Sequence, residues 1–143
     1  MDSETNSELM KIRLPLYVEI PKKTKKNERF YLNQNKFRNC HHFTMNKAKQ
    51  LYKNIIASKF LPDEPLEGQL VFTYTLYPKS KRRMDLTNSL SAIQKFADDA
   101  LVDLGVIPDD DYKTVSKVVY EFGCIDKEDP RAELIVTPFK EGF

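Results

Sequence analysis

The sequence predicts an α+β fold in which two main helices pack against a small mixed or antiparallel sheet of about four strands. Short stretches carry apolar residues at every second position, and two longer stretches carry them three and four positions apart. The elements follow in the order β-α-β-α-β-β, and the last two strands are expected to form a hairpin. A length of 143 residues fits one domain, residues 1–143, with a disordered polar segment at residues 1–10.

The first half of the chain is predicted to supply one strand and one helix. Apolar and polar residues alternate over residues 11–20, which is typical of a half-buried strand. Pro15 inside this run favours an edge strand or a bulge, because proline cannot donate a ladder hydrogen bond. Residues 21–35 show no periodicity and are expected to form a long loop. Residues 43–60 carry a loose apolar stripe and predict the first helix.

The second half is predicted to supply three strands and the clearest helix. Both faces of residues 69–77 carry apolar bulk, which indicates a central strand. Apolar residues recur at helical spacing over residues 86–104, and Gly105 is a natural stop. Two further apolar runs predict strands at residues 113–125 and 132–137.

The composition indicates an ordinary soluble chain. Hydrophobic residues make up 41% and charged residues 31%, and no apolar stretch reaches the roughly 18 residues of a membrane span. The N-terminus lacks the basic and apolar regions of a signal peptide. With only Cys40 and Cys124, the expectation is a reduced, cytoplasmic protein without a disulfide.

The charges are unevenly distributed, although the net charge is only +2. Residues 21–60 hold eleven Lys or Arg and one acid, whereas residues 95–111 hold six Asp. A basic surface beside an acidic spot suits an enzyme that binds nucleic acid and a divalent cation. An uneven but merely solvated surface explains the same distribution.

The long basic loop could contact nucleic acid in two ways. Its lysines, Lys22, Lys23, Lys25 and Lys26, suit phosphate contact, and the aromatic pair at residues 30–31 suits base stacking. A flexible, solvated arm is the alternative.

Residues 79–111 carry the strongest signal of chemistry. A basic cluster (Lys79, Lys81, Arg82 and Arg83) precedes Asp85, and Asp109 to Asp111 follow the predicted helix. Hydrolysis of a phosphodiester can use one or two Mg²⁺ ions held by a few carboxylates. The helix separates the two groups by about 28 Å, so they meet only if the chain doubles back or a second subunit contributes. A helix cap at Asp85 and an exposed acidic turn are the alternatives.

The same stretch resembles the RusA family of Holliday-junction resolvases, many of them encoded by phages and prophages. That family shows a basic run, Asp-x-Asp-Asn, a Lys, Asp-Ala-Leu, a Gly and an Asp-Asp pair. The matching pieces, in order, are Lys81-Arg82-Arg83, Asp85, Asn88, Lys95, Asp99-Ala100-Leu101, Gly105 and Asp109-Asp110. The predicted order of strands and helices also resembles that fold over most of residues 11–137.

The resemblance implies a homodimer that binds four-way DNA junctions and nicks paired strands with Mg²⁺ or Mn²⁺, in a bacterial or phage-infected cytoplasm. It implies metal binding by Asp85 and by Asp110, with Asp109 beside Asp110, and a role for Lys95 near the scissile phosphate. The lysines of the loop and the basic cluster before Asp85 would hold the DNA backbone, so that shape is recognised more than sequence.

The chain departs from the family pattern at two points. Thr87 stands where the family has its second Asp, and Lys95 lies one helical turn further from Asn88 than usual. The lost carboxylate weakens metal binding unless Asn88, Asp99 or a water takes its place. A module on the same scaffold that binds DNA or protein without cutting is therefore the second hypothesis.

Overall fold

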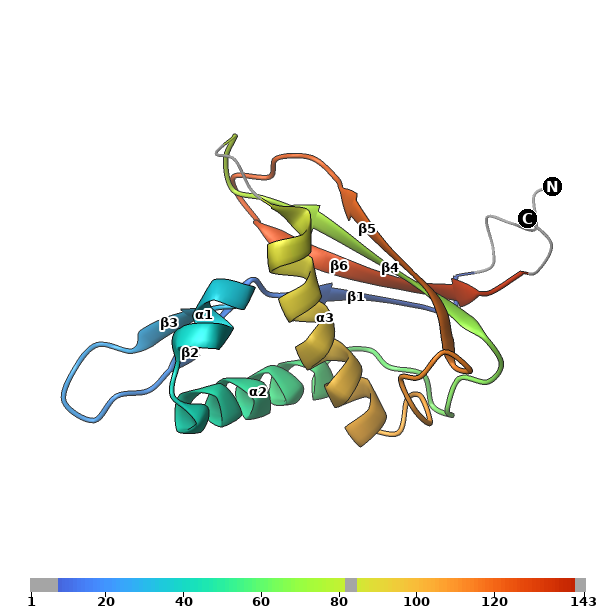
Figure 1. Cartoon of the computed structure of the whole chain (residues 1–143), viewed down its shortest axis with the longest axis horizontal. Helices are drawn as coiled ribbons and strands as arrows, with labels where there is room; N and C mark the ends of the chain where they lie inside the picture. Colours follow the sequence, from blue (N-terminus) through green and yellow to red (C-terminus); the bar gives the residue numbers. More distant parts are fainter. Residues whose placement is uncertain (1–7, 82–84, 141–143) are drawn as a thin grey trace.

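The computed structural model describes residues 8–81 and 85–140 (Figure 1). Within these ranges the chain forms six strands and three helices. The strands are β1 (Met10–Leu14), β2 (Tyr17–Ile20), β3 (Glu28–Tyr31), β4 (Leu70–Tyr77), β5 (Val115–Phe122) and β6 (Arg131–Pro138). The helices are α1 (Gln34–Asn39), α2 (His42–Ala57) and α3 (Leu86–Asp103). The α+β prediction is confirmed.

Four strands form one mixed sheet in the order β1-β6-β4-β5. β6 runs antiparallel to both β1 and β4, whereas β5 runs parallel to β4. The strands β2 and β3 form a separate antiparallel hairpin, which extends away from the sheet (Figure 1). The chain therefore consists of a sheet-and-helix body and a projecting hairpin.

The core lies between the sheet and the two long helices: α3 packs on β4 and β5, and α2 packs against α3 and β2 (Figure 1). The alternating pattern of β4 and β6 sends Phe72, Tyr74 and Leu134 into this core, and Phe96 and Leu101 meet them from α3. Burial of these apolar side chains supplies the main driving force for the fold, at roughly 25 cal/mol per Å². β4 is a central strand, as its two apolar faces predicted.

Pro15 divides the first predicted strand in two. β1 ends at Leu14, β2 begins at Tyr17, and the carbonyl of Pro15 accepts a hydrogen bond from the buried Tyr52 hydroxyl at 2.8 Å. β1 is an edge strand, as the proline indicated. It begins at Met10, which is buried, so the end of the segment that we expected to be disordered forms part of a strand; residues 1–7 of that segment lie outside the described residues.

The predicted long loop is wrong at its C-terminal end. Residues 21–27 are irregular, but residues 28–31 form β3, whose Phe30 is fully buried. A strand of four residues is too short to establish a period in a sequence, and its side chains are fixed by pairing with β2.

The predicted hairpin of the last two strands is also wrong. β5 pairs with β4, and β6 pairs with β4 and β1, so that β4 lies between β5 and β6. The connection over α3 makes the β4–β5 pair parallel, as expected when a helix links two strands of one sheet.

Candidate functional site

Asp85 lies at the N-terminus of α3 and caps it. Its Oδ1 atom accepts hydrogen bonds from the backbone N–H groups of Thr87 (3.0 Å) and Asn88 (3.4 Å). These bonds satisfy donors that have no partner within the helix. The residue is exposed, so its carboxylate caps the helix while remaining open to solvent.

The three consecutive aspartates follow the other end of the same helix. Gly105 ends α3 with a positive φ of 77°, a conformation that glycine adopts without strain. The Asp109 Oδ1 atom accepts from the Asp110 N–H at 2.7 Å, and the Asp111 Oδ1 atom accepts from the Lys113 N–H at 3.1 Å. The Asp110 side chain makes no hydrogen bond or ion pair to another residue in the described ranges, and all three aspartates are exposed.

The two predicted parts of the metal site are far apart within one chain. They flank an 18-residue helix, which spans about 27 Å. Across residues 8–81 and 85–140, no group of three or more His, Cys, Asp or Glu side chains is placed to hold a metal ion. Within the described part of one chain, the carboxylates therefore do not gather into the predicted site.

Two other predicted residues lie on α3 between these groups. Lys95 is exposed near the middle of the helix, about 15 Å along the axis from Asp85. The Asn88 Oδ1 atom accepts from the backbone N–H of Gln34 at 3.0 Å, and the Gln34 side chain donates to the Ser91 hydroxyl at 3.0 Å. Asn88 thus docks α1 onto α3.

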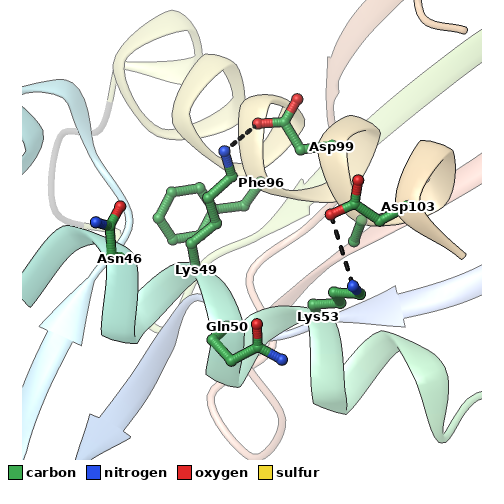
Figure 2. A pocket seen from close by; sticks show the side chains of 8 residues that line it. Asn46, Lys49, Gln50, Lys53, Phe96, Asp99 and Asp103 are labelled. Carbon is green, nitrogen blue, oxygen red and sulfur yellow. Dashed lines mark ion pairs between the residues drawn. The ribbon is translucent and has the colours of Figure 1, made fainter.

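Asp99, a predicted supporting residue, lies in a polar cavity of about 270 Å³ between α2 and α3 (Figure 2). Its carboxylate pairs with Lys49 at 2.7 Å, and Asp103 pairs with Lys53 at 3.6 Å. Both ion pairs join the two helices. Each is partly solvated, which limits its contribution to stability.

Asp98 is a polar residue that the sequence analysis did not single out. It is only 5% exposed, and its carboxylate accepts from the Tyr74 hydroxyl (2.5 Å) and the Gln94 side-chain amide (3.0 Å). The Tyr120 hydroxyl donates in turn to Oε1 of the Gln94 side chain. Burial raises the pKa of Asp98 to about 6, while both hydrogen bonds oppose the shift. Its sequence neighbours, two alanines and Phe96, were a weak sign of burial.

The predicted DNA-contacting residues fall into two described groups. Lys22, Lys23, Lys25 and Lys26 lie in the irregular tip of the β2–β3 hairpin, and Lys22 pairs with Glu28 at 3.0 Å. Lys79 and Lys81 follow β4, and Lys79 lines a cavity together with Ser89 of α3. Arg82 and Arg83, which complete the predicted basic cluster, lie outside the described residues.

Comparisons with known proteins do not assign the chain to a family. No protein-family model matches the chain, and no curated protein matches it. In the part of the chain that the structure describes, no helix is both long enough and apolar enough to cross a membrane.

Proposed function

We propose that the chain is a divalent-metal-dependent, structure-selective DNA endonuclease of the RusA type, which acts as a homodimer on branched DNA in the cytoplasm. The support is the ordered series of motif residues, which falls on one β4–α3–β5 unit, with Asp85 at one end of α3 and the aspartates at residues 109–111 at the other.

One observation carries the proposal. Asp85 and the aspartates at residues 109–111 are exposed at opposite ends of α3, and the neighbouring edge strand β5 has one side without a partner among the described strands. β5 is the outer strand of the sheet and pairs only with β4 among the described strands. Its Val118 and Phe122, which oppose core residues of β4, are 39% and 56% exposed. An open edge with apolar side chains is suited to pairing with a second chain.

A two-fold axis at this edge would bring the two acidic groups together. Asp85 lies near the C-terminal ends of β4 and β5, whereas Asp109 and Asp110 lie near the N-terminal end of β5. If two β5 strands pair antiparallel, the N-terminal end of one lies beside the C-terminal end of the other. Asp85 then meets Asp109 and Asp110 of the partner subunit, and the symmetry forms this composite site twice.

The donor atoms suit Mg²⁺ or Mn²⁺, which prefer carboxylate oxygens, waters and substrate phosphates. Asp85 keeps a second carboxylate oxygen beyond its capping atom, and the Asp110 carboxylate has no competing partner in the described chain. When bound, the ion would activate water and neutralise charge on the phosphate. Lys95 would add positive charge on the exposed face of α3.

The test combines junction cleavage with mixing of two variants. Asp85→Asn and Asp110→Asn should each reduce metal-dependent nicking of a labelled four-way junction by more than about 100-fold, because even residues that only support metal ligands cost about 10–100-fold. Lys59→Gln, which changes a partly exposed lysine outside the proposed site, is the matched control.

Mixing decides whether the site is shared between subunits. In a mixed dimer, the Asp110→Asn subunit supplies Asp85 and the Asp85→Asn subunit supplies Asp110, so one composite site is intact. Nicking should return on mixing, to about one quarter of the wild-type rate, because about half of the randomly formed dimers are mixed and each of these holds one intact site of two. Failure to regain nicking, although subunits exchange, contradicts the composite site. Absence of any metal-dependent nicking by the wild type contradicts the enzyme.

A second candidate is a DNA-binding module that does not cut. It is favoured by Thr87 at the place of a family carboxylate and by the lack of a three-ligand cluster within the described part of one chain. For this candidate, the junction should bind tightly in Mg²⁺, Mn²⁺ or EDTA without cleavage, and Asp110→Asn should leave binding unchanged or tighter.

A further inference from the structure

A groove lies at the base of the β2–β3 hairpin, beside the N-terminal end of α3. It consists of two adjoining cavities of about 360 and 260 Å³, which share Leu16, Tyr31 and Lys79 in their walls. Ser89, in the first turn of α3, lines the larger cavity, and its backbone N–H donates to the Asp85 carbonyl at 3.2 Å. The groove therefore lies within about one helical turn of the proposed site.

The charged lining of this groove is entirely positive. Arg29 on β3, Lys79 after β4, and Lys127 in the β5–β6 connection come from three separate segments. None of the described residues that line either cavity is acidic. Such a lining favours an anionic ligand, and the lysines at the tip of the same hairpin extend the positive charge outward.

Aromatic rings form the wall on the hairpin side. Tyr17 and Tyr31 are paired across β2 and β3, with ring centroids 5.0 Å apart, and the Arg29 guanidinium lies 4.8 Å from the centre of the Tyr17 ring. Tyr31 is 46% exposed, whereas its neighbour Phe30 is fully buried. Of the two aromatic residues that the sequence offered for stacking, only Tyr31 is accessible.

We propose that this groove binds an unpaired segment of a DNA strand, with a base stacked on Tyr31 and phosphates held by Arg29, Lys79 and Lys127. This inference rests on the proposed function, because it names which part of a branched DNA the protein recognises. Cations together with an exposed ring are the combination that binds single strands. In a duplex the base faces are already stacked, and phosphate contacts alone do not require a ring.

The decisive experiment measures binding in EDTA, where no cleavage occurs. Fluorescence anisotropy compares a labelled oligothymidylate of about 12 nucleotides with a duplex of the same length, within the range that single-strand binding modules cover. Tyr31→Leu keeps apolar bulk against Tyr17 but removes the flat ring. It should weaken single-strand binding by about 5- to 150-fold and leave duplex binding nearly unchanged.

Two further variants separate stacking from charge. Tyr31→Phe keeps the ring and should retain single-strand affinity. Lys79→Ala should weaken both DNAs and lower the salt dependence of binding by about one unit of slope. Phe60→Leu, which changes a fully exposed ring at the opposite end of β1, is the matched control and should alter neither affinity.

The outcomes for the groove and for the enzyme are distinct. The stacking role is overturned if Tyr31→Leu binds single-stranded DNA as tightly as the wild type. It is also overturned if the variant melts at the wild-type temperature but loses equal affinity for both DNAs. If the wild type cuts junctions and Tyr31→Leu binds normally, the groove fails and the nuclease stands. If no junction is cut but Tyr31→Leu selectively loses single-strand binding, the groove stands and the nuclease fails.

Discussion

The two edges of the sheet are built differently. At the β1 edge, the apolar side chains of Met10, Ile12 and Leu14 are all buried by the chain itself, and the outward-facing Lys11 and Arg13 form ion pairs. At the β5 edge, the corresponding positions on the helix-covered face are partly open, and only Tyr120 is anchored to the core by hydrogen bonds.

This difference is the reason for placing the interface of the proposed dimer at β5. Charged side chains and a short strand protect a sheet edge from unwanted pairing, and β1 has both. β5 is eight residues long, and its exposed apolar side chains lack cover within the described chain. The β1 edge is complete in one chain, whereas the β5 edge is the one that a partner would complete.

The largest expected effect comes from charging the β5 edge. Val118→Glu places a carboxylate where the two subunits would meet, and a change at the centre of an interface costs at least about 2 kcal/mol. We expect the dimer dissociation constant to rise by about 30-fold or more and junction cleavage to fall with it. Sedimentation velocity over a concentration series measures the first quantity.

Leu9→Glu is the matched control, because Leu9 is an exposed leucine beside the β1 edge. It should leave both dimerisation and cleavage unchanged. A monomeric wild type at high concentration, or a Val118→Glu variant that dimerises normally, would show that the β5 edge is not the interface.

The next effect concerns the buried hydrogen bonds that hold β5 and α3 to β4. Tyr74→Phe removes the hydroxyl that donates to Asp98, and an unsatisfied buried acceptor costs about 1–3 kcal/mol. The unfolding free energy in urea should fall by that amount at pH 7. Tyr112→Phe removes the hydroxyl of an exposed tyrosine and should cost nothing measurable.

The pH dependence of stability should identify the same carboxylate. The folded-state pKa of Asp98 is raised to about 6 from the ordinary value of 3.8, so the folded chain binds the proton more tightly between these values. Its contribution to stability is therefore present at low pH and is lost as the pH rises through about 6, by roughly 3 kcal/mol. Urea titrations at several pH values should show this slope in the wild type and not in Asp98→Asn.

The smallest effect is expected at the β1 edge. Asp129 is exposed and hydrogen-bonded by Arg13 at 2.6 Å, which lowers the pKa of Asp129. A lowered pKa makes stability depend on pH in the opposite direction to that of Asp98. The stabilisation is present at neutral pH and is lost as the pH falls through the folded-state pKa. Asp129→Asn should lower the melting temperature by no more than a degree or two at neutral pH, and by less in acid. A large loss would mean that this edge depends on its ion pairs.

The sequence predicted elements well where one local pattern determines them. The spacing of apolar residues gave the bounds of α3 within a residue, Gly105 marked its end, and the two apolar faces of β4 indicated a central strand. Pairing could not be predicted in the same way. Adjacency along the chain suggested that β5 and β6 form a hairpin, but the partner of a strand depends on contacts distant in sequence.

The candidate site shows the same limit. The motif pointed to Asp85 and to the aspartates after α3. The sequence also predicted that the helix between them would keep them from sharing a metal ion, and within the described part of one chain they are indeed apart. The sequence did not predict the ion pair of Lys49 with Asp99 and gave only a weak sign that Asp98 is buried, because both depend on how α2 and β4 pack against α3. The exposure of Tyr31 and burial of Phe30 required knowing that β3 exists.

The pairing of β1 with β6 has a consequence for how the chain is made. Among the described strands, β1 leaves the ribosome before the others, yet its partner strand is β6, which leaves after the others. Contacts between such distant segments form slowly, because a long loop must close before they are gained. During synthesis β1 must therefore stay unpaired until Arg131–Pro138 emerges, so folding of the sheet can finish only after translation has passed that strand.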